Sequence, residues 1–138
     1  MSQNYQNHVR WSIPYHCITV PIILIANGFA AYALYQTPDA VHALLLLAFF
    51  LIGIVVGFAR FFALKVQDRA ARADERLRYF ILAGKMLPNE LKMGQILALR
   101  FASDEEVVAL ADRALHEKLA AGDIKKAIKN WRGDYHRI

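Results

Sequence analysis

Side chains that could act as nucleophiles, bases or metal ligands are few and scattered along this sequence. The histidines lack the HxxxH or HExxH spacing of a zinc site. They are His8, His16, His42, His116 and His136. A single cysteine, Cys17, excludes an intrachain disulfide and a cysteine-based metal cluster. No glycine-rich phosphate loop or dinucleotide fingerprint occurs. We therefore expect a non-catalytic protein without metal or cofactor, in which the histidines are interfacial or surface residues.

A glycine pair offers a different chemistry, which is close helix packing. Gly53 and Gly57 form a GxxxG pattern in an apolar stretch, and glycines four residues apart let a neighbouring helix approach closely. Two partners are open: a second copy of the chain, or the preceding apolar segment with its small residues Ala26, Ala30 and Ala33. We favour the preceding segment, because a hairpin already brings it alongside.

Asn27 is the one amide in the first apolar segment. Polar groups inside a membrane are often functional, but no ionisable residue accompanies this one. We expect a hydrogen bond to the second apolar segment or to a dimer mate, with a transport role as the alternative.

The end of the chain carries a basic cluster. Its members are Lys125, Lys126, Lys129 and Arg132. We expect them on the outer face of a last helix, where they are either solvated or attracted to anionic lipid headgroups or a protein. Contact with nucleic acid phosphates is a further alternative. It is disfavoured because the neighbouring predicted helix opens with three acidic residues at 104–106.

Two long apolar segments define the first half of the chain. Only Arg10 and Arg60 of the 17 lysines and arginines precede Lys65, and 57% of all residues are hydrophobic. Residues 17–36 and 40–60 are each long enough to cross a bilayer. A cleavable signal peptide is the alternative for the first, from the A-x-A pattern of Ala31 and Ala33, although a bulky Tyr32 lies between them. Near this predicted interface, Cys17 is either a plain apolar residue or a palmitoylation site.

The flanks of the two segments predict an orientation. The connection at 37–39 is short and contains Pro38, so the spans form an antiparallel hairpin. Basic residues flank the other ends and stay in the cytoplasm. We therefore expect a cytoplasmic segment 1–16, a span 17–36, an external turn 37–39, a span 40–60 that leaves the membrane at Arg60, and a cytoplasmic domain 61–138. Both termini would face the cytoplasm from an inner membrane.

The second span is predicted to continue as one helix. The stretch from Ala40 to Gly84 contains no proline, and Gly84 is followed by Pro88, as is common at helix ends. Beyond Arg60 the apolar residues recur at steps of four and three, which places them on one face as an apolar seam. They are Val66, Ala70, Ala73, Leu77 and Ile81. On the other face we expect the ion pairs Asp68–Arg72 and Asp74–Arg78, each four residues apart.

Three shorter helices are predicted after Gly84. The first covers about 90–101, and the second starts at Ser103, where Glu106 completes a capping box. Gly122 would end the second helix and Asp123 would cap the third. The inner face of the third would carry Ile124, Ala127, Ile128 and Trp131.

Four segments together carry a family resemblance: QNHVRW, LKVQDRAARADERLRYFILAGK, QILALRFASDEE and IKKAIKNWRGDYHRI. With them the chain resembles an uncharacterised bacterial family of small two-span membrane proteins, a domain of unknown function. The resemblance implies a membrane hairpin with a cytoplasmic helical tail. It brings no activity, ligand or site residue.

The sequence thus predicts an all-α membrane protein, a two-helix hairpin continuing into a small cytoplasmic helical domain. Its function would be that of an interaction or scaffold module, with the lipid bilayer and a homodimer mate or larger membrane complex as partners. The alternatives are an accessory subunit of a transporter or membrane enzyme complex, and a membrane-tethered nucleic-acid-binding protein.

Overall fold

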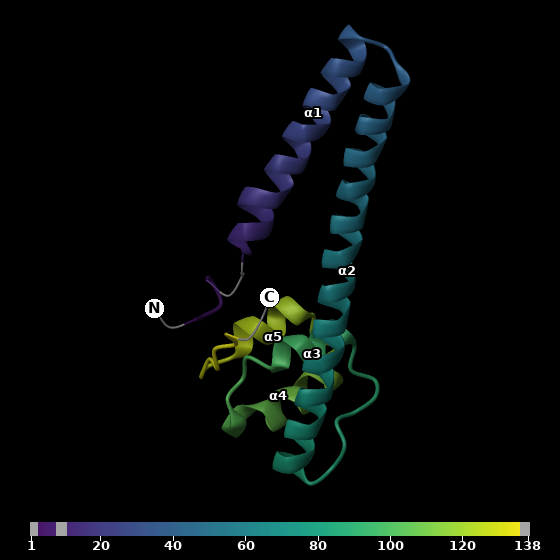
Figure 1. Cartoon of the computed structure of the whole chain (residues 1–138). Coiled ribbons are helices and arrows are strands. Elements are labelled where there is room, and N and C mark those ends of the chain that lie inside the picture. The colour runs from purple at the N-terminus through teal and green to yellow at the C-terminus, as the bar shows by residue number, and fades with distance from the viewer. Residues whose placement is uncertain (1–2, 8–10, 136–138) are drawn as a thin grey trace. The chain divides into compact units, whose positions relative to one another are not determined.

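The computed structural model describes residues 3–7 and 11–135, and helices are its regular elements (Figure 1). The helices are η1 (Pro14–Thr19), α1 (Val20–Gln36), α2 (Ala40–Ala83), α3 (Met93–Leu99), α4 (Asp104–His116) and α5 (Ala121–Ala127). No strand occurs among the described residues. The chain divides into two compact units, Trp11–Leu64 and Met1–Arg10 with Lys65–Ile138. His8, Arg10 and His136 lie outside the described residues, as do parts of the predicted segment 1–16.

The first unit begins with a helical turn before the predicted start at residue 17. Pro14 opens the π-helical element η1, because its missing N–H costs nothing at the start of a helix. The hydroxyl of Thr19 donates to the Pro14 carbonyl at 3.0 Å and so occupies an acceptor of the wide turn. Helix α1 then ends at Gln36, where the predicted segment 17–36 also ends, since Thr37 before Pro38 is extended.

Helix α2 is one 44-residue element, as the proline-free stretch predicts. It ends at Ala83, and Gly84 takes the left-handed conformation at φ +65° while its N–H bonds the Phe80 carbonyl at 2.9 Å. Two helical stretches, Pro14–Gln36 and Ala40–Ala83, are apolar and long enough to cross a membrane by length and composition. Few side chains in their most apolar windows are buried.

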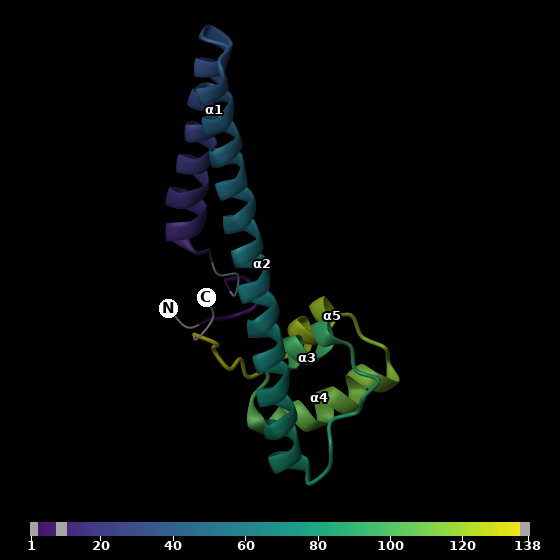
Figure 2. The same ribbon diagram turned by 45° about the vertical axis from the view of Figure 1, so that its right-hand side comes forward.

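In the second unit α3, α4 and α5 pack together into a small domain (Figure 2). The core also receives Tyr79 from α2, whose side chain is 1% exposed. Its other buried members are Leu87, Leu91, Ile96, Ala98, Leu99, Ala102, Val107, Leu110, Ala111, Ala114 and Ile124. Three short helices are therefore present, as predicted, and each is shorter than its predicted range.

The turn between α4 and α5 differs from the prediction. Helix α4 ends at His116, and Lys118 takes the left-handed conformation at φ 51°. Its N–H bonds the Leu115 carbonyl at 3.4 Å and that of Leu119 bonds the Ala114 carbonyl at 3.1 Å, which is a Schellman motif. Because the lysine makes the turn, the assignments of Gly122 as terminator and Asp123 as cap are wrong.

Gly122 and Asp123 lie inside α5, whose N-cap is Ala120. Helix α5 then ends at Ala127, before the predicted Ile128 and Trp131. The following segment pairs with residues 101–103 instead: Arg132 N–H bonds the Phe101 carbonyl at 2.7 Å, and Ser103 N–H bonds the Asn130 carbonyl at 3.1 Å. These backbone bonds replace those of a continued helix, so the extension to Trp131 is wrong.

Candidate functional site

The two glycines of the hairpin have different surroundings. A Cβ atom at Gly53 would lie 3.2 Å from Cγ2 of Ile23 on α1, so α1 and α2 approach closely there. A Cβ at Gly57 would meet nothing within 4 Å. Gly53 therefore packs on the preceding helix, as favoured from the sequence, although its neighbour is Ile23 and not one of the predicted alanines. Gly57 leaves open space.

Asn27 turns its amide to its own helix. The side-chain Nδ2 donates to the Ile23 carbonyl one turn earlier at 2.8 Å, where we expected a bond to α2 or to a dimer mate. Asn27 also borders a hollow of ≈ 460 Å³ between α1 and α2, together with Gly53, Phe50 and Leu24. In the described part of the chain no group is seen to donate to its Oδ1.

Arg60 faces an aromatic ring within the hairpin unit. Its guanidinium carbon lies 5.4 Å from the centre of the Tyr15 ring, which is cation–π distance. Tyr and Arg side chains are both typical of the interface between a bilayer and water. This pair is what a membrane exit at Arg60 would require.

The basic cluster does not form one helix face. Lys125 and Lys126 lie on α5, but Lys129 and Arg132 follow its end, so the prediction of a shared helical face is wrong. Acidic neighbours also offset part of the charge. Lys126 lies 3.5 Å from Asp123, and Arg132 lies 4.0 Å from Asp104.

Lys125 joins an aromatic cluster instead of standing in water. The Phe101 ring stacks on Trp131 with centres 4.7 Å apart and planes at 20°. Lys125 Nζ lies 5.6 Å from the centre of the same Phe101 ring, and the Arg100 guanidinium carbon 4.8 Å. Such contacts stabilise a cation over a ring, so these two charges support the fold of the domain.

Arg78 links α2 to the start of α4. It donates to Glu75 at 3.0 Å, to Asp104 at 2.7 Å and to the Ala102 carbonyl at 2.7 Å, and its side chain is 12% exposed. The predicted partner Asp74 is not among these acceptors, and Asp68 forms no ion pair with Arg72 in the described structure. The predicted i,i+4 pairs are therefore wrong; Arg78 binds Glu75, Asp104 and the Ala102 carbonyl instead of Asp74, and nothing in the described structure explains the missing Asp68–Arg72 pair.

Glu106 holds the segment after α5. Its carboxylate accepts the N–H groups of Lys129 and Asn130 at 3.1 Å each, and that of Ser103 at 3.4 Å. The last contact is the reciprocal arm of the predicted capping box. The bonds to Lys129 and Asn130 join residues far apart in sequence, and no sequence pattern predicts them.

The apolar face of α2 beyond Arg60 points outward. Val66, Leu77 and Ile81 are exposed, as are Ala70 and Ala73 between them. Tyr79 and Arg78, which lie outside this row, make the contacts with the domain. The spacing of the row from Val66 to Ile81 puts its residues on one face of the helix, and this face is uncovered in the described structure. This unpartnered row is the candidate functional surface.

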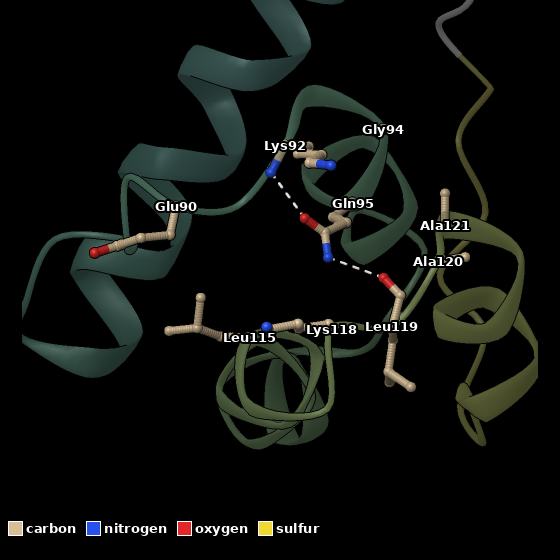
Figure 3. Close-up of a pocket in the computed structure, with 9 residues that line it drawn as sticks. All are labelled: Glu90, Lys92, Gly94, Gln95, Leu115, Lys118, Leu119, Ala120 and Ala121. Atoms are coloured by element: carbon tan, nitrogen blue, oxygen red, sulfur yellow. Dashed lines mark hydrogen bonds between the residues drawn. The ribbon is translucent and has the colours of Figure 1, made fainter.

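A hollow of the helical domain lies between α3 and the α4–α5 turn. It measures ≈ 770 Å³ and is lined by Glu90, Lys92, Gly94, Gln95, Leu115, Lys118, Leu119, Ala120 and Ala121. Figure 3 shows Gln95 bridging it: Oε1 accepts the Lys92 N–H at 2.8 Å and Nε2 donates to the Leu119 carbonyl at 2.9 Å. Both polar ends of Gln95 serve the fold, so the hollow displays no convergent reactive groups.

Among residues 3–7 and 11–135 no group of three His, Cys, Asp or Glu side chains is placed to hold a metal. Cys17 is exposed and free. The features above define a class: an all-helical protein in which two apolar helices precede a small helical domain with an exposed apolar face.

The chain belongs to the family of unknown function DUF6526, whose sequence profile matches residues 1–138. The resemblance to an uncharacterised family is thereby confirmed. Comparison with curated proteins gives no match, and neither does comparison with solved structures.

Proposed function

We propose that this protein is an integral inner-membrane protein whose helical domain is a non-catalytic interaction module. One observation carries the membrane assignment: large apolar side chains on α1 and α2 are exposed along both helices. They include Ile22, Leu24, Ile25, Phe29, Leu44, Leu47, Phe50, Val55 and Phe58. Lipid is the surrounding that such a surface requires, because water would have to hydrate all of it.

The proposed orientation places both termini in the cytoplasm. The turn between α1 and α2 carries Asp39 and no basic residue, whereas Arg60, Lys65 and Arg69 follow the second apolar segment. Short positive flanks are retained on the cytoplasmic side. The pairing of Arg60 with Tyr15 supports an interface at this level.

Alkaline carbonate extraction and cysteine labelling test this proposal. In a Cys17→Ser background, Asp39→Cys is expected to react in intact cells with a thiol reagent that cannot cross the membrane. Arg132→Cys is expected to react only after the cells are opened. Release of the chain by carbonate would overturn the membrane assignment, and labelling at residue 132 in intact cells would overturn the orientation.

The role as an interaction module is supported by what the domain offers. Its polar clusters are engaged in the fold, as Arg78, Glu106 and Gln95 show, while its apolar side chains on α2 are left uncovered. Affinity capture from native membranes tests this role, with Leu77→Asp as the comparison because it changes the exposed apolar face without touching the core. Capture of the same chains by both forms would contradict it.

A second candidate, accessory subunit of a larger membrane complex, has its own observation. The hollow beside Asn27 and Gly53 is open to the surroundings of the hairpin, and a neighbouring span could fill it and donate to Asn27. A Gly53→Ala or Asn27→Leu variant that stays in the membrane but loses a co-purifying multi-span protein would favour this candidate. Nucleic-acid binding receives less support, because the basic cluster is split between two elements and partly paired with acidic residues.

A further inference from the structure

Four residues of the exposed row on α2, together with Phe80 in place of its neighbour Ile81, have the spacing of a coiled-coil seam. Val66, Ala70, Ala73, Leu77 and Phe80 follow one another at steps of four, three, four and three. This step pattern is the a/d repeat of helices that wrap around each other. The relative exposures of Val66, Leu77 and Phe80 are 66%, 61% and 47%. No residue of the described domain covers them.

The charges beside this row match a parallel pair of identical helices. When Ala70 and Leu77 take position a, Arg69 takes position g and Asp74 takes position e. In a parallel coiled coil, g of one helix lies beside e of the next heptad in its partner. Arg69 of each copy would therefore meet Asp74 of the other, twice by symmetry.

Neither of these two charged side chains forms an ion pair within the described part of the chain. Arg69 and Asp74 are exposed, and no ion pair of either is found in the described structure. Arg78, which does form ion pairs within the chain, takes position b and lies outside the a/d seam. An antiparallel pair would instead place like charges together, g beside g and e beside e.

We infer that the exposed face from Val66 to Phe80 binds a second copy of this chain as a parallel, two-fold coiled coil. The parallel direction rests on the proposed function, because two copies in one membrane leave it on the same side. Ala70 and Ala73 bring the two helices close, while Val66, Leu77 and Phe80 fill the contact.

Such a contact is short, and helices of this length associate weakly in solution. Anchoring both copies in one membrane raises their effective concentration, which lets a short seam hold. We therefore expect copies anchored in one membrane to pair through the seam, and copies diluted in detergent to be monomeric.

Disulfide crosslinking of the full chain in native membranes tests the seam. In a Cys17→Ser background, Ala73→Cys is expected to form a covalent dimer on mild oxidation. Leu82→Cys is the matched control, exposed on the same helix but at position f, away from the seam. Equal crosslinking at both positions, or none at residue 73, would overturn the proposal.

A charge exchange tests the direction. Starting from Ala73→Cys, the single changes Arg69→Glu and Asp74→Arg are each expected to lower the dimer yield roughly two- to tenfold, as loss of two exposed ion pairs implies. The double exchange is expected to restore it. Single changes without effect, or a double exchange that restores nothing, would overturn the parallel register.

Carbonate extraction of the same membranes separates the two hypotheses. If the chain is extracted, the membrane assignment has failed. If it stays in the membrane and residues 73 and 82 crosslink alike, only the dimer has failed.

Discussion

Nε of Arg78 donates to the carboxylate of Asp104 at 2.7 Å, although 26 residues separate them. The contact fixes α2 to the first turn of α4, where an acidic residue also complements the positive end of the helix dipole.

Stability of the domain can be followed locally, because the chain has two tryptophans and Trp131 lies on the Phe101 ring. A Trp11→Phe background therefore makes fluorescence report on the domain, and urea unfolding of the full chain in detergent measures its free energy.

Arg78→Ala is expected to lower the free energy of unfolding by about 2–3 kcal/mol. The change leaves Glu75 and the Ala102 carbonyl without their donor in a poorly hydrated setting. Lys126→Ala is the control, since its pair with Asp123 is exposed and is expected to be worth under about 0.5 kcal/mol. Equal effects of the two changes would show that the Arg78 contacts contribute little.

Glu106→Gln is expected to cost about 1–2 kcal/mol. The amide keeps one acceptor oxygen, but its NH₂ group cannot accept a backbone N–H, so Lys129, Asn130 or Ser103 loses its partner. Glu105→Gln, on the exposed side of the same turn, should cost much less than Glu106→Gln. If Glu106→Gln lowered the free energy of unfolding no more than Glu105→Gln does, the backbone hydrogen bonds of Glu106 would contribute little to stability.

Lys118→Gly is expected to raise stability by about 1 kcal/mol, because glycine reaches the left-handed conformation without the Cβ clash of lysine.

Gly122→Ala should also stabilise, by about 0.5 kcal/mol, since it lies within α5 and a Cβ there meets nothing within 4 Å. The same change at Gly84, at φ +65°, is expected to destabilise by about 1 kcal/mol. A destabilising Gly122→Ala would restore that glycine as the helix terminator.

Tyr79→Phe is expected to remove a decrease in the free energy of unfolding that the wild type shows above about pH 10. Burial raises the pKa of the Tyr79 phenol, and the negative charge of Asp112 at 3.4 Å raises it further. The fold thus favours the neutral phenol, so this stabilisation is complete below the ordinary pKa of about 10 and is lost as the pH rises above it.

Unfolding of both forms between pH 8 and about 11 measures this effect. The difference in stability between wild type and Tyr79→Phe should be constant up to about pH 10 and then move against wild type. Asp112→Asn keeps the burial but removes the charge, so it should give an intermediate slope. Parallel curves for all three proteins would contradict the assignment.

Gly53→Leu and Gly57→Leu should behave differently in the hairpin. At residue 53 a side chain would meet Ile23 on α1 and force the two helices apart, whereas residue 57 has open space. Disulfide formation between Val20→Cys and Val56→Cys, which line the same hollow of the hairpin, is expected in a Cys17→Ser background to fall strongly with Gly53→Leu and little with Gly57→Leu. The opposite order would mean that Gly57 is the packing glycine.

The helices of this protein follow from local patterns in the sequence. Absence of proline from Ala40 onward, the left-handed Gly84 and the reciprocal cap of Ser103 and Glu106 all act within a few residues, so the sequence alone predicts them. Patterns of this kind also predict the apolar character of the two long helices.

The contacts between elements could not be predicted in the same way. The spacing of Asp74 and Arg78 indicates a helix pair, but the guanidinium finds better acceptors in Glu75, Asp104 and the Ala102 carbonyl. Likewise, the spacing of the apolar row on α2 defines a face but not its partner, and the domain instead contacts the buried Tyr79 and pairs Asp104 with Arg78. These contacts depend on which surfaces meet in the folded chain. The preferences of single residues for helix or turn do not contain that information.

The core of the domain draws all its members from the stretch between Tyr79 and Ile124. Contacts so close in sequence need only short loop closures, and domains built from them fold quickly. During synthesis, this part of the chain can therefore close soon after Ile124 has left the ribosome. Little time remains for its apolar side chains to associate with those of unfinished neighbours.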